Sequence, residues 1–475
     1  MAALALAAPG TASAATNPGY NLTAHQAIEI ARTDPKVLVE QAKWGHLTPS
    51  ATTKDTTWQV GFYTGDRELV LVVVDDATGA ITESWTGYQV AWQMARGYPG
   101  AFGRKINAPY VWLPLCALFA CGLWDWRRWR RLAHLDLAML LAFGVSHYFF
   151  NRADIGVSVP LVYPVLVYLL ARMAWIGFRG RGEGLRPSLP TGWLALGVIF
   201  LLSFRIGLDV TDSNVIDVGY SGVIGADRAI HGKPMYGEGA FPADNASGDT
   251  YGPANYYAYV PFELAWPWSG TWDDLPAAHA AAIAFDLMAV AGLFLLGRRI
   301  RPGPAGARLG VILAYAWAAY PYTAFALESN SNDTLVAVLV IGALLLVGPA
   351  IDPGLGTFWQ RTITYQANRS SPFSIWGQTN LGWLHTTVEV LTVALALAVA
   401  FVPRRRDLRQ VAALAATVLI ATELCADHWF YLYIPWFFPL VAVALAAEPG
   451  RVAQRATEDE LVREAGAPVG AAAAA

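Results

Sequence analysis

The chain has 475 residues and a formal net charge of −3; 55% of the residues are hydrophobic and only 15% are charged. A typical globular protein carries about 25% charged residues. This deficit, together with a mean hydropathy of +0.36 and 19 tryptophans, excludes a disordered chain, a coiled coil and a nucleic-acid-binding protein. The composition predicts a mostly α-helical, multi-span membrane protein.

The first residues are rich in alanine and end in the triplet Ala12-Ser13-Ala14. We expect residues 1–15 to be the remainder of a secretory signal peptide, since a small-residue triplet of this kind marks a cleavage site. The segment that follows would then lie outside the cytoplasm.

Residues 22–100 predict a small extracytoplasmic α+β domain. Thr23 and Gln26 have the spacing of a capping box, which favours a helix start, and a second helix is expected from Pro35 to Lys43. Apolar or alternating runs at 58–63, 69–74 and 80–85, separated by turn residues, predict antiparallel strands. The stretch VVVDDATGAI at 72–81 resembles the signature of PepSY domains, which implies a binding or regulatory module.

About ten apolar segments follow within a membrane domain at 108–447, and each has roughly the 20 residues that cross a bilayer. They are 108–124, 132–150, 157–178, 191–208, 277–297, 309–327, 334–350, 384–402, 410–425 and 429–447. Arginine clusters follow the first, third, fifth and eighth segments, and such clusters mark cytoplasmic loops. This rule predicts an extracytoplasmic N-terminal domain, a large extracytoplasmic loop at 209–276 and a cytoplasmic, disordered tail at 448–475.

The crossing count conflicts with the arginine rule at one place. If residues 334–350 cross the bilayer, residues 404–409 fall on the outer side, although four of them are arginines. Either 334–350 is re-entrant, or a stretch has been lost near 335–352.

The loop at 209–276 carries most of the candidate chemistry. Asp209 and Asp212 directly follow a span, and Asp217 begins a segment, 215–230, whose spacing predicts an interfacial helix. Three carboxylates this close to a membrane favour a functional site. Asp227 and Arg228 would point from this helix into a cavity at the level of the lipid headgroups.

Several short motifs occur in a consistent order. Asp217 and Tyr220 precede a Gly232-Lys-Pro-Met-Tyr236 element, Tyr251-Gly-Pro begins the next span, and Ser329-Asn-Ser-Asn-Asp333 follows a later one. Over roughly 191–447 this layout resembles the GT-C class of membrane glycosyltransferases, in particular the actinobacterial mannosyltransferases that use polyprenol-phosphate-mannose. The resemblance implies a GT-C-like helical bundle and an inverting transfer of a sugar, such as mannose, from a polyprenyl-phosphate donor to a cell-envelope glycan or lipid.

On this hypothesis, Asp217 is the base that deprotonates the acceptor hydroxyl, with Asp209 or Asp212 as rivals. Arg228, Arg361 and His428 are candidate contacts to the donor phosphate. The remaining candidate substrate-binding residues are Tyr220, Asp227, Tyr251, Asn332, Asp333 and Gln366. The residues indicate no cofactor and no metal-ligand spacing, and they leave a need for a divalent cation open.

Two other classes of function remain. In a transporter or channel, the intramembrane charges Asp286, Glu389 and Arg205 would form a polar pathway. Equally, Arg205 could pair with either acid for a purely structural reason. In a non-catalytic sensor, the PepSY-like domain would bind a ligand and the spans would be its anchor.

Overall fold

The computed structural model describes residues 19–54, 56–65, 67–98, 102–128, 130–180, 184–237, 239–345, 371–379, 381–403 and 407–447. The predicted signal remainder at 1–15, the predicted tail at 448–475 and the candidate residues Arg361 and Gln366 lie outside these ranges. The chain divides into two compact units, Met1–Ala101 and Phe102–Ala475.

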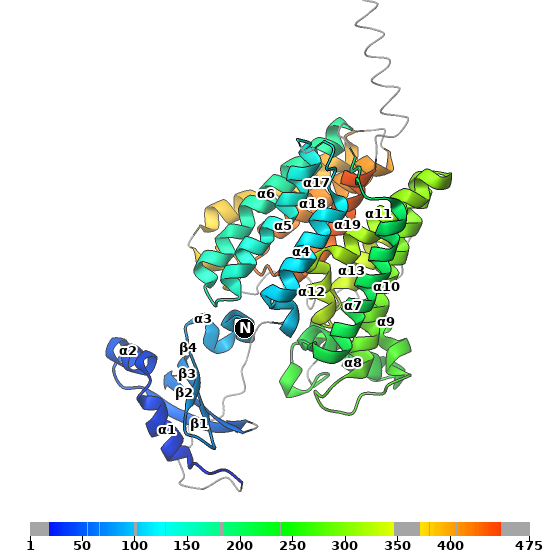
Figure 1. Cartoon of the computed structure of the whole chain (residues 1–475). Coiled ribbons are helices and arrows are strands. Elements are labelled where there is room, and N and C mark those ends of the chain that lie inside the picture. The colour runs from blue at the N-terminus through cyan, green and yellow to red at the C-terminus, as the bar shows by residue number, and fades with distance from the viewer. Residues whose placement is uncertain are drawn as a thin grey trace, which may run out of the picture. The chain divides into compact units, whose positions relative to one another are not determined.

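The first unit packs two helices on a four-stranded antiparallel sheet whose strands follow chain order (Figure 1). The elements are α1 (Ala24–Arg32), α2 (Pro35–Trp44), β1 (Thr48–Lys54), β2 (Thr57–Thr64), β3 (Arg67–Asp75), β4 (Ile81–Thr86), α3 (Tyr88–Ala91) and η1 (Gln93–Arg96). The predicted capping box is confirmed, because Thr23 and Gln26 exchange hydrogen bonds at the start of α1. Strand β1 was not predicted, since its sequence TPSATTK has no apolar alternation.

Two aspartates lie at the turn after β3, within the stretch 72–81. Asp75 accepts hydrogen bonds from the backbone amide and the hydroxyl of Thr78, which closes the turn between β3 and β4. Burial by itself would raise the pKa of Asp76, but the amides of Asn21 and Leu22 and the indole of Trp58 donate to its carboxylate and hold the pKa below its usual range. Asp76 thereby fastens the chain before α1 to the sheet.

The second unit is a bundle of helices (Figure 1). Its main helices are α4 (Pro109–Leu123), α5 (Leu132–Phe150), α6 (Ile155–Arg179), α7 (Thr191–Asp212), α8 (Asp217–Ile230), α9 (Pro253–Glu263), α10 (Pro276–Ile300), α11 (Gly303–Ala319), α12 (Pro321–Glu328), α13 (Asp333–Leu345), α17 (Gly382–Phe401), α18 (Leu408–Cys425) and α19 (Ile434–Ala446). Shorter pieces are η2 (Arg104–Asn107), η3 (Ala243–Asn245), η4 (Gly248–Thr250), α16 (Ile375–Gln378) and η6 (Tyr431–Tyr433). Helix α6 packs between α5 and α18, α10 packs against α11 and α13, and α11 also contacts α7.

Six helices in the described residues are long and apolar enough to cross a membrane, namely α5, α6, α7, α10, α17 and α18. A seventh span is possible if α11 and α12, which bend by 59° at the break before Pro321, count as one. Helices α4 and α13 and the segment Tyr431–Ala446 are apolar but shorter. The chain is therefore a multi-pass membrane protein, but the predicted number of ten spans is not confirmed, and the sidedness of its ends stays a prediction.

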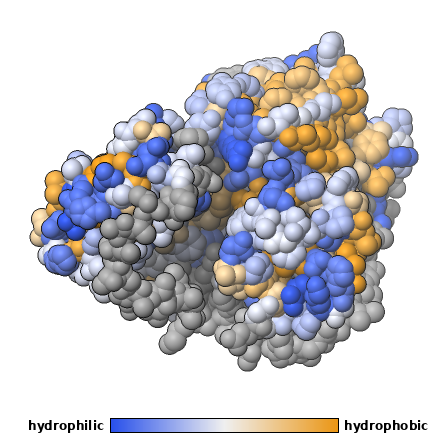
Figure 2. Space-filling model, turned by 90° about the horizontal axis from the view of Figure 1, so that it is seen from below, coloured by the Kyte–Doolittle hydropathy of each residue, from blue (hydrophilic) through white to orange (hydrophobic). Residues whose placement is uncertain are grey.

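Apolar side chains cover the outer surfaces of these helices. Trp193, Leu196 and Phe200 on α7 are 68%, 58% and 63% exposed, and none of the residues of α17 is buried. Such surfaces are stable in contact with lipid tails rather than water. Figure 2 looks onto the end of the bundle that carries α8 and α9, where hydrophilic residues gather, and it shows hydrophobic residues along the flank.

A buried ion pair fixes the inner part of the bundle. Arg205 on α7 and Asp286 on α10 are both fully buried, and their side chains meet at 2.7 Å. Arg205 also donates to the carbonyls of Trp317 and Ala318 at the bend between α11 and α12, and the indole of Trp317 donates to Asp286. One of the two pairings that the sequence left open, Arg205 with Asp286, is thus the one that forms. The pair holds the next turn of α7, which carries Asp209, in place.

Candidate functional site

Two connections that are far apart in sequence lie side by side at the end of the bundle. The link between α7 and α8 is bonded to the link between α12 and α13: the amide of Asn214 donates to the carbonyl of Glu328, and that of Ile216 donates to the carbonyl of Ser329. The side-chain amide of Asn330 also donates to the hydroxyl of Ser213 at 2.8 Å. The three aspartates and the Ser-Asn-Ser-Asn-Asp motif therefore belong to one site, which we call the α7–α13 junction (residues 209–217 and 328–333).

The backbone at the junction is tightly fitted. Asn330 has a left-handed backbone (φ 47°), which asparagine tolerates better than most other residues. Its carbonyl oxygen would lie 2.1 Å from a Cβ at Gly219, so the first turn of α8 can approach only because that residue is glycine. This contact sets the distance between α8 and the motif.

The three candidate aspartates have different surroundings. Asp209 is buried, and its carboxylate lies 3.2 Å from Nδ1 of His279 on α10. Asp212 forms an ion pair with Lys105 of η2. Asp217 is exposed and lies in the first turn of α8, where the helix dipole favours a negative charge. Of the three carboxylates, that of Asp217 is the most accessible to a substrate.

The end of the motif is held by hydrogen bonds. Asp333 is buried, and its two carboxylate oxygens accept from the hydroxyl of Ser331 at 2.6 Å and from the indole of Trp436 at 2.8 Å. The side-chain amide of Asn332 donates to Asn255 on α9 at 2.8 Å. The negative charges of Asp217 and Asp333 repel each other, so the two acids are close enough to interact electrostatically.

Glu328, a residue that was not among the predicted site residues, belongs to the junction through its carbonyl, which accepts from the amide of Asn214. It is fully buried, and neither carboxylate oxygen has a hydrogen-bond partner among the described residues. The negative charges of Asp209 and Asp286 repel its carboxylate, and the positive charge of Arg205 attracts it. The available sequence signal was its position as the last residue of an apolar run, directly before the motif. A buried acid of this kind is unusual, because native proteins satisfy nearly all buried polar groups.

The other predicted residues of the loop surround α8. Tyr220 is fully buried and stacks on Trp272 with a centroid distance of 4.8 Å. The backbone carbonyl of Tyr251 accepts from the hydroxyl of Tyr236 at 3.0 Å. Tyr220, Tyr236 and Tyr251 belong to one hydrophobic cluster with residues of α8, α9 and α10, and a role of Tyr220 or Tyr251 in binding a sugar stays a prediction.

Polar residues at the C-terminal end of α8 organise the turn after it. Nε of Arg228 donates to the carbonyl of Pro234, and Asp227 lies 3.0 Å from Nδ1 of His231. Nearby, the carboxylate of Glu263 accepts from the amide of Trp268 at 2.6 Å. Burial of Glu263 raises its pKa to about 7, although the hydrogen bond from Trp268 opposes the shift.

His428 lies on the connection between α18 and α19, where its Nδ1 is 2.7 Å from the hydroxyl of Ser371. The adjacent Trp429 donates its indole N–H to the buried Glu423 of α18 at 3.0 Å. The aromatic residues on this connection are internal, since Trp429, Phe430 and Tyr431 are at most 4% exposed. Tyr431 forms hydrogen bonds with Ser146 and Ser158 instead.

Within the ranges that the structure describes, no group of three or more histidine, cysteine, aspartate or glutamate side chains is arranged to hold a metal ion. No family model, no curated protein and no solved structure matches the chain. The site must therefore be interpreted from its own chemistry.

Proposed function

We propose that the chain is an inverting membrane glycosyltransferase that uses a polyprenyl-phosphate sugar as donor, with mannose as the first sugar to test. The observation that carries the proposal is the α7–α13 junction. It brings an exposed aspartate at the start of α8 next to a motif held by Asn332 and Asp333, at the end of helices that lie in lipid. A lipid-linked sugar would meet protein side chains at this level of the bilayer.

The reaction requires little from the protein. The acceptor hydroxyl oxygen forms a bond to the anomeric carbon while the bond from that carbon to the phosphate oxygen breaks, so the configuration inverts. The phosphate leaves with the bonding electron pair, and it needs no strong general acid. A carboxylate takes the proton of the acceptor hydroxyl, a contribution of about 10²–10⁴-fold.

We give this role to Asp217 because its carboxylate is the most accessible of the three. Asp217 is exposed, whereas Asp209 is buried beside His279 and Asp212, which pairs with Lys105, is only partly exposed. Asp212 would then hold the cationic side chain of Lys105 at the junction, where it could attract the donor phosphate. The contacts proposed for Arg361 and Gln366 concern residues outside the described ranges.

The transporter alternative lacks a comparable observation. Arg205 and Asp286 are bonded to each other and to Trp317, which makes them a structural tie between helices. Glu389 lies 3.6 Å from His385 on the same helix, α17, so it does not extend a polar path from Arg205.

The test is donor turnover by the full chain reconstituted in phosphatidylcholine vesicles. Polyprenyl-phosphate mannose, glucose and arabinofuranose are supplied with a simple alkyl glycoside acceptor, and released polyprenyl phosphate and glycosylated product are measured. Asp217→Asn should lower turnover by about 10²–10⁴-fold. Asp274→Asn, which removes an exposed acid from the same loop, should retain it.

The assignment of Asp217 as the base and the proposed activity can be refuted independently of each other. Equal turnover by the wild type and Asp217→Asn would overturn the assignment of the base. If the folded wild type consumes none of the three donors, the proposed activity is wrong.

A further inference from the structure

A cavity of about 580 Å³ lies at the other end of the same helices. Its lining includes Arg186 from the connection between α6 and α7, Arg301 and Arg308 around the start of α11, and Ala446 at the end of α19. Helix α7 begins beside this cavity and ends at Asp212, and its 22 residues at about 1.5 Å each separate the cavity from the α7–α13 junction by roughly 30 Å. The cavity is therefore separate from the site proposed for glycosyl transfer.

The walls of the cavity are fixed by backbone contacts. The amide of Leu185 donates to the carbonyl of Leu445 at 2.7 Å, and the carbonyl of Gly184 accepts from Arg131 at 2.9 Å. A Cβ at Gly184 would lie only 2.9 Å from the carbonyl oxygen of Ala446, so this connection is pressed against the end of α19. The position of Arg186 thus follows from main-chain packing.

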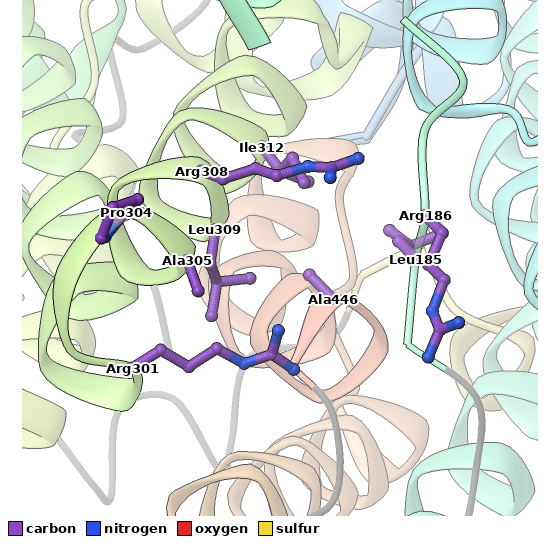
Figure 3. Close-up of a pocket in the computed structure, with 9 residues that line it drawn as sticks. All are labelled: Leu185, Arg186, Arg301, Pro304, Ala305, Arg308, Leu309, Ile312 and Ala446. Carbon is purple, nitrogen blue, oxygen red and sulfur yellow. The ribbon is translucent and has the colours of Figure 1, made fainter. Parts of the chain in front are cut away.

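The cavity has the chemistry of an anion site. Arg301 and Arg308 extend from one side and Arg186 lies on the other, with Ala446 between them (Figure 3). No acidic residue occurs among the described residues that line it. The first turn of α11 also contributes to the wall through Pro304 and Ala305, and no side chain caps that helix end, so its positive dipole adds to the charge. Guanidinium groups match the geometry of phosphate oxygens.

The rest of the lining is apolar. Leu185, Leu309 and Ile312 contribute hydrocarbon surface next to the three arginines. Leu189 and Trp193, which continue from Arg186 into α7, are 38% and 68% exposed, as expected for side chains at the boundary between lipid and water. A ligand that suits both parts has a phosphate group attached to hydrocarbon chains.

We propose that this cavity binds the phosphate headgroup of an anionic membrane lipid, with the acyl chains running along Leu309 and Ile312 of α11. Basic pockets between membrane helices commonly bind lipids of this kind. The lipid would join α11, α19 and the connection before α7 at one end of the bundle. This inference does not depend on the proposed glycosyl transfer.

The experiment measures lipid binding by the full chain in a neutral detergent, with three probes: dioleoylphosphatidylglycerol, dioleoylphosphatidylcholine and inorganic phosphate. Binding is followed by native mass spectrometry and by the shift in thermal unfolding. We expect phosphatidylglycerol to bind at lower concentration than the zwitterionic lipid. Each arginine at a membrane surface contributes a factor of about five, so Arg186→Gln together with Arg308→Gln should weaken binding about 30-fold.

The matched control removes the same charge elsewhere. Arg128 and Arg298 are exposed and do not line the cavity, so their double substitution by glutamine should leave the affinity for phosphatidylglycerol within about twofold of wild type. An equal loss in the control, or no loss in the Arg186/Arg308 variant, would overturn the site. Inorganic phosphate that competes at concentrations comparable with those of the lipid would show a free-anion site and overturn the lipid as ligand.

Discussion

Removal of the guanidinium of Arg205 should destabilise the helical unit by about 3–5 kcal/mol, because it leaves the buried carboxylate of Asp286 without its cation. Both side chains are 0% exposed and meet at 2.7 Å. Two unit charges about 4 Å apart attract each other by roughly 4 kcal/mol at an effective dielectric constant of 20. The hydrogen bond from Trp317 to Asp286 remains in the variant and is too weak to compensate for the lost charge.

The assay is a double-mutant cycle on the full chain. Unfolding by sodium dodecyl sulfate in mixed micelles is measured for the wild type, Arg205→Met, Asp286→Leu and the double variant. Each single variant leaves one buried charge unpaired and should lose several kcal/mol, whereas the double variant should lie within about 1–2 kcal/mol of the wild type. The reasoning is refuted if Arg205→Met unfolds within about 0.5 kcal/mol of the wild type, or if the two single effects simply add.

Three further outcomes follow from the structure. The raised pKa of Glu263 means that its carboxylate lowers stability as the pH rises from about 4 to 7. Glu263→Gln should therefore increase the free energy of unfolding at pH 8 by up to about 3 kcal/mol, seen as a higher thermal midpoint, and leave it nearly unchanged at pH 4. Equal effects at both pH values would contradict this. The lowered pKa of Asp76 means that its contribution to stability is present above about pH 4 and lost as the pH falls further. The protection of β2 amides in the full chain, measured as the exchange rate relative to an unstructured peptide at the same pH, should therefore fall in acid, and Asp76→Asn should show the reduced protection at every pH. A Cβ at Gly297 would lie 2.2 Å from the backbone nitrogen of Gly310, so Gly297→Ala should lower stability by about 1–3 kcal/mol. Gly207→Ala, whose Cβ would meet open space, should not lower it, and thermal unfolding of both variants checks the packing of α10 on α11.

Local sequence patterns determined the membrane class and the positions of most elements. The helix expected at 215–230 appears as α8, and each of the ten predicted apolar segments contains a helix in its described part. These predictions succeed because apolar periodicity, capping residues and turn residues act within a few positions along the chain. The break between α11 and α12 also has a local cause, since Pro321 has no amide hydrogen to continue the helix, although the sequence analysis treated 309–327 as one segment.

Tertiary structure alone decided which polar groups meet. Asp286 and Glu389 were equal candidates to pair with Arg205, and only the packing of α7 on α10 selected Asp286. Likewise, Glu328 became part of the candidate site because its own carbonyl and that of Ser329 accept hydrogen bonds from a segment more than a hundred residues earlier. Charge and polarity show that an intramembrane or near-membrane group needs a partner, but the identity of that partner depends on distances that no local pattern encodes.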